Sequence, residues 1–219
     1  MGISYMSQEE IYNPDFQKSD IQIIGVGSTG SFLALTLAKM GLKDIKIIDY
    51  DKVENHNIPN QFYKIKDENK EKLDALKDII KEFSDIEIKT ENIKIDKNYS
   101  FDVGLNTIVL ICVDNMESRE IIFNKLKDFP IKKLIDTRFG GEGFSIHVVD
   151  LEKEEEKERY EKSLKLPIKE TPCGEKGIIY SILSLSSEVC NIIKKIECGE
   201  NYPKLLKREL KTYRFIVRR

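Results

Sequence analysis

Several glycines stand at a spacing that suits the binding of a phosphate group. The sequence G-V-G-S-T-G runs directly from an apolar segment, residues 21–24, into a segment with helical spacing. Glycine lets the backbone turn tightly and approach a phosphate, and a helix start offers free N–H groups and the positive end of its dipole. This context predicts a phosphate-binding loop that contains Gly25, Gly27, Ser28, Thr29 and Gly30.

An acidic residue follows at the place where the ribose of a nucleotide would lie. Asp49 closes the next apolar segment, 19 residues after Gly30. A carboxylate at that point of a strand–helix–strand unit accepts hydrogen bonds from ribose hydroxyls. The loop and this acid predict a nucleotide site that suits NAD as well as ATP. The alternative is a glycine turn that serves only to pack the helix against the strand.

The elements that would position these residues alternate between strand and helix patterns. Short apolar runs predict buried strands, and apolar residues at helical spacing predict helices. We therefore predict an α/β fold, Rossmann-like and doubly wound, with a mainly parallel sheet and helices on both faces. The expected strands lie at 21–24, 45–48, within 86–95, and at 108–113, 133–136 and 144–149, and the expected helices at 29–40, 69–83, 116–127 and 178–196.

The chain is expected to form one domain with a flanking segment at each end. Residues 1–19 are interpreted as an N-terminal lead-in, residues 20–200 as the nucleotide-binding domain, and residues 201–219 as a C-terminal tail with an edge strand. Within the domain, residues 151–177 are expected to form a crossover loop because they hold a charged run and two prolines. The charged run is interpreted as a solvated loop or an exposed helix.

Composition argues against several classes of protein. The 36 basic and 38 acidic residues give a net charge of −2, whereas non-specific nucleic-acid binding needs a basic surface. No apolar run reaches the roughly 18 residues of a membrane helix, and the first residues lack the layout of a signal peptide. We therefore expect a cytoplasmic protein with reduced thiols. The four cysteines form no C-x-x-C pair and there are only two histidines, so we expect neither zinc nor a histidine-based triad.

A longer motif after the second expected strand distinguishes between the nucleotides. Residues 49–61 read D-Y-D-K-V-E-N-H-N-I-P-N-Q, which resembles the D-x-D-x-V-x-x-x-N-x-x-R-Q signature of the ThiF/MoeB (ubiquitin-activating-like) family. Further on, I-C-V-D-N at 111–115 followed by Arg119 resembles the D-N-x-x-x-R stretch of that family. Cys173 lies in a loop where many members have a cysteine. The resemblance covers residues 20–197.

The resemblance implies a reaction and its substrates. Enzymes of this family use ATP and Mg²⁺ to adenylate the C-terminal glycine of a small ubiquitin-like protein or a peptide. Pyrophosphate leaves, and a thiol or sulfur acceptor then takes the activated acyl group. Because family members commonly pair, the resemblance also implies a homodimer, with the apolar helix at 178–196 as a candidate contact.

The resemblance also assigns roles to individual residues. Asp49 would hold the ribose, Lys72 would contact the phosphates, and Asp114 would bind Mg²⁺. Arg119 would support the loop that carries Asp114, and Cys173 is a candidate thiol acceptor. Mg²⁺ is typically held by one or two carboxylates together with phosphate oxygens, which suits a lone acid beside the phosphates. Further nucleotide contacts are expected from Asp51, Asn57, Asn60 and Gln61.

Two cations of the family pattern are absent from this sequence. Asn60 stands where the signature has arginine, and no arginine precedes Arg119. The candidate replacements are mostly lysines, which lack the bidentate fork of arginine: Lys18, Lys64, Lys66, Lys70 and Arg138. This departure keeps two alternatives open. One is a catalytically weak nucleotide-binding member that acts as a partner subunit or sensor, and the other is an NAD(P)-binding oxidoreductase.

The remaining cysteines and the histidines have simpler interpretations. Cys112 and Cys190 lie in apolar segments and are expected to pack in the core. His147 is interpreted as structural and His56 as a local hydrogen-bonding residue. Cys198 follows the last helix and receives no role.

Overall fold

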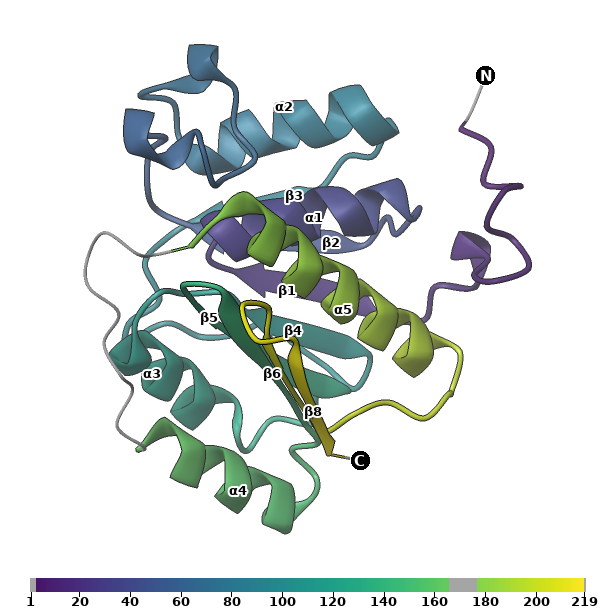
Figure 1. Ribbon diagram of the computed structural model, residues 1–219, viewed down its shortest axis with the longest axis vertical. Helices are drawn as coiled ribbons and strands as arrows, with labels where there is room; N and C mark the ends of the chain where they lie inside the picture. Colours follow the sequence, from purple (N-terminus) through teal and green to yellow (C-terminus); the bar gives the residue numbers. More distant parts are fainter. Residues whose placement is uncertain (1–2, 166–176, 219) are drawn as a thin grey trace.

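A computed structural model describes residues 3–165 and 177–218 (Figure 1). Its centre is an eight-stranded sheet in the order β3-β2-β1-β4-β5-β6-β7-β8. The strands are β1 (Asp20–Ile24), β2 (Ile45–Asp49), β3 (Lys89–Asn92), β4 (Thr107–Ile111), β5 (Lys133–Gly140), β6 (Gly143–Val149), β7 (Leu205–Glu209) and β8 (Arg214–Arg218). The helices are α1 (Ser28–Lys39), α2 (Lys72–Ser84), α3 (Met116–Leu126), α4 (Glu154–Leu164) and α5 (Ile179–Glu197), with 3₁₀ turns η1 (Pro14–Phe16), η2 (Asn55–Asn57) and η3 (Ile65–Asp67).

The first five strands of the sheet are parallel, and their register aligns their carboxyl ends. Ile24 at the end of β1 pairs with Ile48 on one side and with Ile111 on the other, and Ile111 in turn pairs with Asp136. The chain moves from β1 outward to β2 and β3, then returns to the other side of β1 as β4. Strand order therefore reverses between β1 and β4, and ligands of such sheets bind at this reversal, beyond the carboxyl ends.

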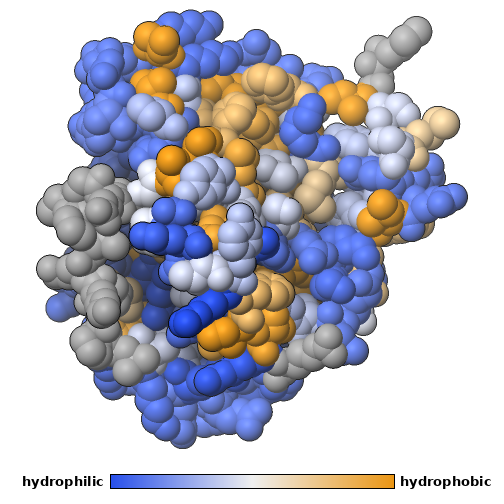
Figure 2. Space-filling view, in the orientation of Figure 1, coloured by the Kyte–Doolittle hydropathy of each residue, from blue (hydrophilic) through white to orange (hydrophobic). Residues whose placement is uncertain are grey.

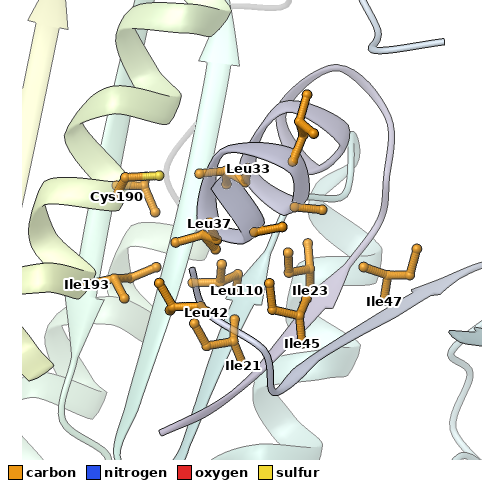
Figure 3. Close-up of a cluster of buried hydrophobic side chains, with 14 of the residues drawn as sticks. Ile21, Ile23, Leu33, Leu37, Leu42, Ile45, Ile47, Leu110, Cys190 and Ile193 are labelled. Carbon is orange, nitrogen blue, oxygen red and sulfur yellow. The ribbon is translucent and has the colours of Figure 1, made fainter. Parts of the chain in front are cut away.

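Two apolar cores lie on opposite faces of the sheet. One contains Ile21 and Ile23 of β1 together with buried side chains of α1, α2 and α5, and Figure 3 shows Leu33 and Leu37 of α1 against this face. The other contains Ile24 and Ile48 with buried side chains of α3 and α4. Helices on both faces of a mainly parallel sheet confirm the predicted doubly wound architecture.

Three segments contain more structure than their sequence patterns indicated. The described part of residues 151–177 contains α4, whose Glu156 and Tyr160 are buried, so this charged run is not simply a solvated face. Residues 201–219 contain β7 as well as the expected edge strand β8, and both pair antiparallel in the main sheet. In the lead-in, Tyr12 and Pro14 are buried.

Two element boundaries differ from the prediction by more than two residues. Helix α2 begins at Lys72 and not at Asn69, because Asn69 has a left-handed φ of 68° that a helix cannot contain. Strand β5 continues four residues past Asp136, where it forms a hairpin with β6. Within the described ranges, no helix has the length and apolar character needed to cross a bilayer.

Candidate nucleotide site

The glycine loop joins β1 to α1 at the reversal of strand order, and two of its glycines have no room for a side chain. Gly25 has a φ of +87°, and a Cβ there would lie 3.0 Å from the carbonyl oxygen of Cys112, the residue that follows β4. A Cβ on Gly30 would lie 1.9 Å from the carbonyl oxygen of Gly25. These two positions require glycine because the loop turns tightly between two strands and a helix.

The third glycine has open space around it in the described part of the structure. Gly27 precedes the first turn of α1. Among the described residues, no side chain caps that helix start, and the nearest atom to an added Cβ would be the Gln61 amide nitrogen at 4.0 Å. Ser28 and Thr29 follow in the first turn. The N–H groups of an uncapped helix start attract an anion, so this arrangement suits a phosphate group.

Asp49 ties the end of β2 to the glycine loop. Its buried carboxylate accepts hydrogen bonds from the backbone N–H of Val26 at 2.6 Å, of Tyr50 at 2.7 Å and of Asp51 at 2.8 Å. A carboxylate offers about four acceptor positions, so capacity for about one further donor remains. The residue expected to hold the ribose thus also organises the loop itself.

Lys72 and Asp51 form an ion pair at the same edge of the sheet. Lys72 opens α2 and is buried, and its Nζ lies 2.9 Å from Oδ2 of the half-exposed Asp51. The backbone N–H of Lys72 also donates to the carbonyl of Asp51 at 2.9 Å. The ammonium group is therefore held in place by Asp51, beside the strand end that carries Asp49.

Asp114 lies in the short loop between β4 and α3. It is exposed, and its carboxylate accepts one side-chain hydrogen bond, from the neighbouring Asn115 at 3.1 Å. Asn115 caps α3 by accepting from Ser118 N at 2.8 Å, which fixes the direction in which the loop enters the helix. An exposed carboxylate with free acceptor positions at this edge can bind a cation.

A buried network of two arginines and one aspartate supports the loop that carries Asp114. Arg119 is buried in α3 and donates to the carbonyl oxygen of Val113 and to Asp136. Asp136 is fully buried in β5 and also accepts from Arg138 Nε at 2.7 Å. Burial alone would raise the pKa of Asp136, but the charges of Arg119 and Arg138 outweigh it and lower the pKa. The network therefore keeps a carboxylate ionised inside the protein.

The signature residues after Asp51 divide into two kinds. Asn57 is buried and its side-chain oxygen accepts from Glu54 N at 3.0 Å, so it shapes the signature segment itself. Asn60 and Gln61 each have a buried amide oxygen that no donor in the described residues reaches. Both side chains therefore retain hydrogen-bonding capacity, and the amide nitrogen of Gln61 lies near Gly27 of the loop.

The five cations considered as replacements for the missing arginines differ in position and in their acidic partners. Lys18 precedes β1 and so lies at the amino end of the sheet, which excludes it from this site. Lys64 is paired with Glu82, Lys70 with Asp67 and Arg138 with Asp136, while Lys66 is exposed on η3. Cys173, the candidate thiol acceptor, lies outside the described residues.

The site contains two residues that the sequence analysis missed. The buried hydroxyl of Tyr63 donates to the carbonyl oxygen of Val26 at 2.7 Å, across 37 residues of sequence, and no local pattern signals such a contact. Asp136 could have been noticed, because it follows two apolar residues, Leu134 and Ile135, just as Asp49 follows Ile47 and Ile48. Both bear on the geometry of the loops.

The other candidate residues lie in ordinary structural settings. Cys190 is buried and Cys112 packs against the core, and burial raises the pKa of each thiol to about 12, which makes both unreactive. Burial lowers the pKa of His147 to about 3. His56 is exposed, 3.2 Å from Glu54. In the part of the chain that is described, no three His, Cys, Asp or Glu side chains gather as metal ligands.

Comparisons with known proteins fit this geometry. Residues 8–213 match the sequence profile of the ThiF family. Ubiquitin-like modifier-activating enzyme 5 of Caenorhabditis elegans is 32% identical over 116 residues, which are 47% of this chain and 28% of that protein. The same enzyme of Aedes aegypti is 32% identical over 136 residues, 56% of this chain and 34% of that protein. The chain thus spans about a third of the length of these relatives.

Solved structures show the same fold. A crystal structure of PaaA superposes with a TM-score of 0.72 at 21% identity, covering 93% of this chain and 74% of that one. Escherichia coli MccB in complex with ATP superposes with a TM-score of 0.68 at 15% identity, covering 94% of this chain and 65% of that one. The match to the family profile extends over nearly the whole sequence, from the lead-in to the last hairpin. The chain belongs to the ThiF family.

Proposed function

We propose that the protein is an ATP-dependent adenylyltransferase that activates the C-terminal glycine of a small ubiquitin-like protein or a peptide. The observation that carries this proposal is the convergence of the glycine loop, Asp49, Lys72 and the Asp114 loop at one edge of the sheet in a member of the ThiF family. The relatives named above are activating enzymes for ubiquitin-like modifiers, and MccB has been crystallised with ATP and with MccA.

The residues of this edge suit the nucleotide and its metal. An open helix start at Gly27 suits phosphate oxygens, and the remaining acceptor position of Asp49 suits a ribose hydroxyl. Asp114 has free carboxylate oxygens to hold Mg²⁺. Bound there, Mg²⁺ would neutralise phosphate charge as a Lewis acid.

In the proposed reaction, the terminal carboxylate attacks the α-phosphorus of ATP. A bond forms between the carboxylate oxygen and phosphorus, the bond to the bridging oxygen breaks, and pyrophosphate leaves with the electron pair. The nucleophile is already ionised at neutral pH, so no general base is required. The protein must bring two anions together, the terminal carboxylate and the phosphates of ATP. We assign the neutralising positive charge to Lys72 and the orientation of the phosphates to the N–H groups at the start of α1. Transfer of the acyl group to a thiol, with Cys173 as candidate, belongs to the same proposal: the thiolate would bond to the acyl carbon, and AMP would leave with the electron pair of the broken bond between that carbon and the phosphate oxygen.

Asp114→Asn tests this proposal through ATP–pyrophosphate exchange in the presence of a carrier or peptide that ends in glycine. We expect the exchange rate to fall at least a hundredfold, because the amide cannot replace an anionic metal ligand. Asp128→Asn, an exposed residue beyond the other end of α3, is the matched control and should keep the wild-type rate. Equal exchange by both variants would overturn the metal-binding role of Asp114.

A second candidate function is that of a catalytically weak, nucleotide-binding subunit. It is favoured by Asn60 in place of arginine and by the fact that Lys64, Lys70 and Arg138, like Lys72 itself, are each engaged by an acid. Such a protein would bind Mg·ATP but show no exchange above background with any carrier. Asn60→Arg would then be expected to raise the exchange rate, because it restores a charge beside the phosphates.

A further inference from the structure

The peptide groups of the glycine loop are held from two sides at Val26. Its N–H donates to Oδ2 of Asp49 at 2.6 Å, and its carbonyl oxygen accepts from the Tyr63 hydroxyl at 2.7 Å. Val26 is fully buried between Gly25 and Gly27. Glycines on both sides give this stretch its freedom to turn, so the two hydrogen bonds are what restrict the orientation of the peptides between them.

Tyr63 reaches the loop from a segment that is itself fixed on α1. The backbone N–H of Phe62 donates to the buried Ser31 hydroxyl at 3.0 Å, and the Phe62 ring packs edge-on against Phe32 at 5.1 Å between centroids. Tyr63 is 7% exposed, and burial together with nearby acids raises the pKa of its hydroxyl well above the ordinary value. The hydroxyl therefore stays protonated and remains a donor.

Loss of this donor would leave the Val26 carbonyl without a hydrogen-bond partner among the described residues. A buried carbonyl without a hydrogen bond is unfavourable, and the loop can regain one only by turning toward water or another donor. Such a turn would move the adjoining peptide of Gly27, which precedes the first turn of α1. The direction of the N–H groups at the helix start thus depends on a hydroxyl 37 residues away.

We infer that Tyr63 is a positioning residue for phosphate binding, whose hydroxyl fixes the Val26 peptide and, through it, the N–H groups at the start of α1. The part of this inference that concerns ATP binding rests on the proposed function. Its geometric part, the fixing of the loop, can be tested without any ligand.

Tyr63→Phe keeps the buried ring and removes only the hydroxyl. Tyr99→Phe is the matched control, because Tyr99 is also buried and donates to Glu91 at 2.9 Å, but it packs in the core on the other face of the sheet. Two measurements are made on wild type and both variants: amide hydrogen exchange of residues 25–30 without ligand, and the Kd of Mg·ATP by calorimetry.

We expect Tyr63→Phe to speed exchange in the loop about tenfold and to raise the Kd of Mg·ATP about tenfold, as the loss of one hydrogen bond implies. Tyr99→Phe should change neither, even if both variants lose similar thermal stability. Unchanged loop exchange in Tyr63→Phe would overturn the inference, and so would an unchanged Kd while wild type binds Mg·ATP. If wild type binds no Mg·ATP, the proposed function fails, and loop exchange alone still decides whether Tyr63 fixes the loop.

Discussion

At the scale of single residues, the Asp114 loop depends on a carboxylate that never meets solvent. Asp136 joins Arg119, which holds the Val113 carbonyl, to Arg138, which also donates to Ser163 of α4 at 2.9 and 3.0 Å. Asp136→Asn would leave two arginines without their counter-charge. We expect the free energy of unfolding to fall by about 3–5 kcal/mol, as for other broken buried pairs, in urea denaturation at pH 7. A loss below about 1 kcal/mol would show that the network contributes little.

The same residue contributes to the pH dependence of stability. Because Arg119 and Arg138 lower its pKa in the folded protein, the ionised carboxylate stabilises the fold above the unfolded pKa of about 4. That contribution is lost as the pH falls through the lower, folded value. Asp136→Asn lacks it at every pH, so its stability should approach that of wild type below about pH 4. Curves for the two proteins that stay parallel down to pH 2 would contradict this role.

Residues that act through local chain geometry could be predicted from the sequence. Residues that act through contacts between distant parts of the chain could not. Gly25 and Gly30 were found because a tight strand–helix turn demands glycine at a fixed spacing. Tyr63 and Asp136 act through partners 37 and 17 residues away, and periodicity carries no information about such contacts. Pairing of the proposed replacement cations with acids likewise depends on tertiary positions.

At the scale of elements, the glycines of the β1–loop–α1 unit have two different roles. Some are needed for the fold, and Gly27 is needed for ligand binding. A Cβ on Gly30 would overlap the Gly25 carbonyl, so Gly30→Ala should destabilise the fold by several kcal/mol. Gly27 has a φ of −72° and free space, so Gly27→Ala should cost about 1 kcal/mol or less. Thermal unfolding of both variants checks this order, and an equal loss of stability would contradict it. Gly27→Ala should also lose stabilisation by Mg·ATP.

Most elements could be predicted from periodicity because they lie in the core. Strands β1, β2 and β4 are largely buried on both faces, which gives short and mostly apolar runs, and α1 and α5 carry long apolar faces. Helix α4 was obscured by its charges: Glu156 is buried because it accepts from Asp150 N and pairs with Lys204 at 3.1 Å. Strand β7 is stabilised by pairing with β6 on one side and with β8 on the other, and no local sequence pattern predicts this pairing.

At the scale of the whole molecule, one apolar surface remains exposed beside the antiparallel end of the sheet. Figure 2 shows apolar side chains where α5 and β8 lie in Figure 1. The start of α5 contributes Leu183, 50% exposed, while the later apolar residues of this helix are buried in the chain's own core. Strand β8 contributes Phe215 and Val217, 55% and 43% exposed. We propose this surface, here called the α5–β8 surface, as the homodimer contact.

Leu183→Glu tests the homodimer proposal. A charge on the α5–β8 surface would be desolvated on association, so we expect the variant to be monomeric at concentrations where wild type has twice the mass of one chain. Light scattering coupled to size exclusion measures this. Glu155→Lys, on the exposed side of α4, is a control for a surface charge change. A monomeric wild type would contradict the proposal.

The most direct test of nucleotide binding is the thermal melting of the whole protein with Mg·ATP, with ATP plus a chelator, and with NAD. A ligand that binds only the folded state raises the free energy of unfolding by RT ln(1 + [L]/Kd), which is about 2.7 kcal/mol at a ligand concentration of a hundred times Kd. We expect Mg·ATP to raise the melting temperature by several degrees, ATP with chelator to raise it less, and NAD to leave it unchanged. Stabilisation by NAD and not by Mg·ATP would contradict the proposed adenylyltransferase and favour a dinucleotide-binding protein with the same fold.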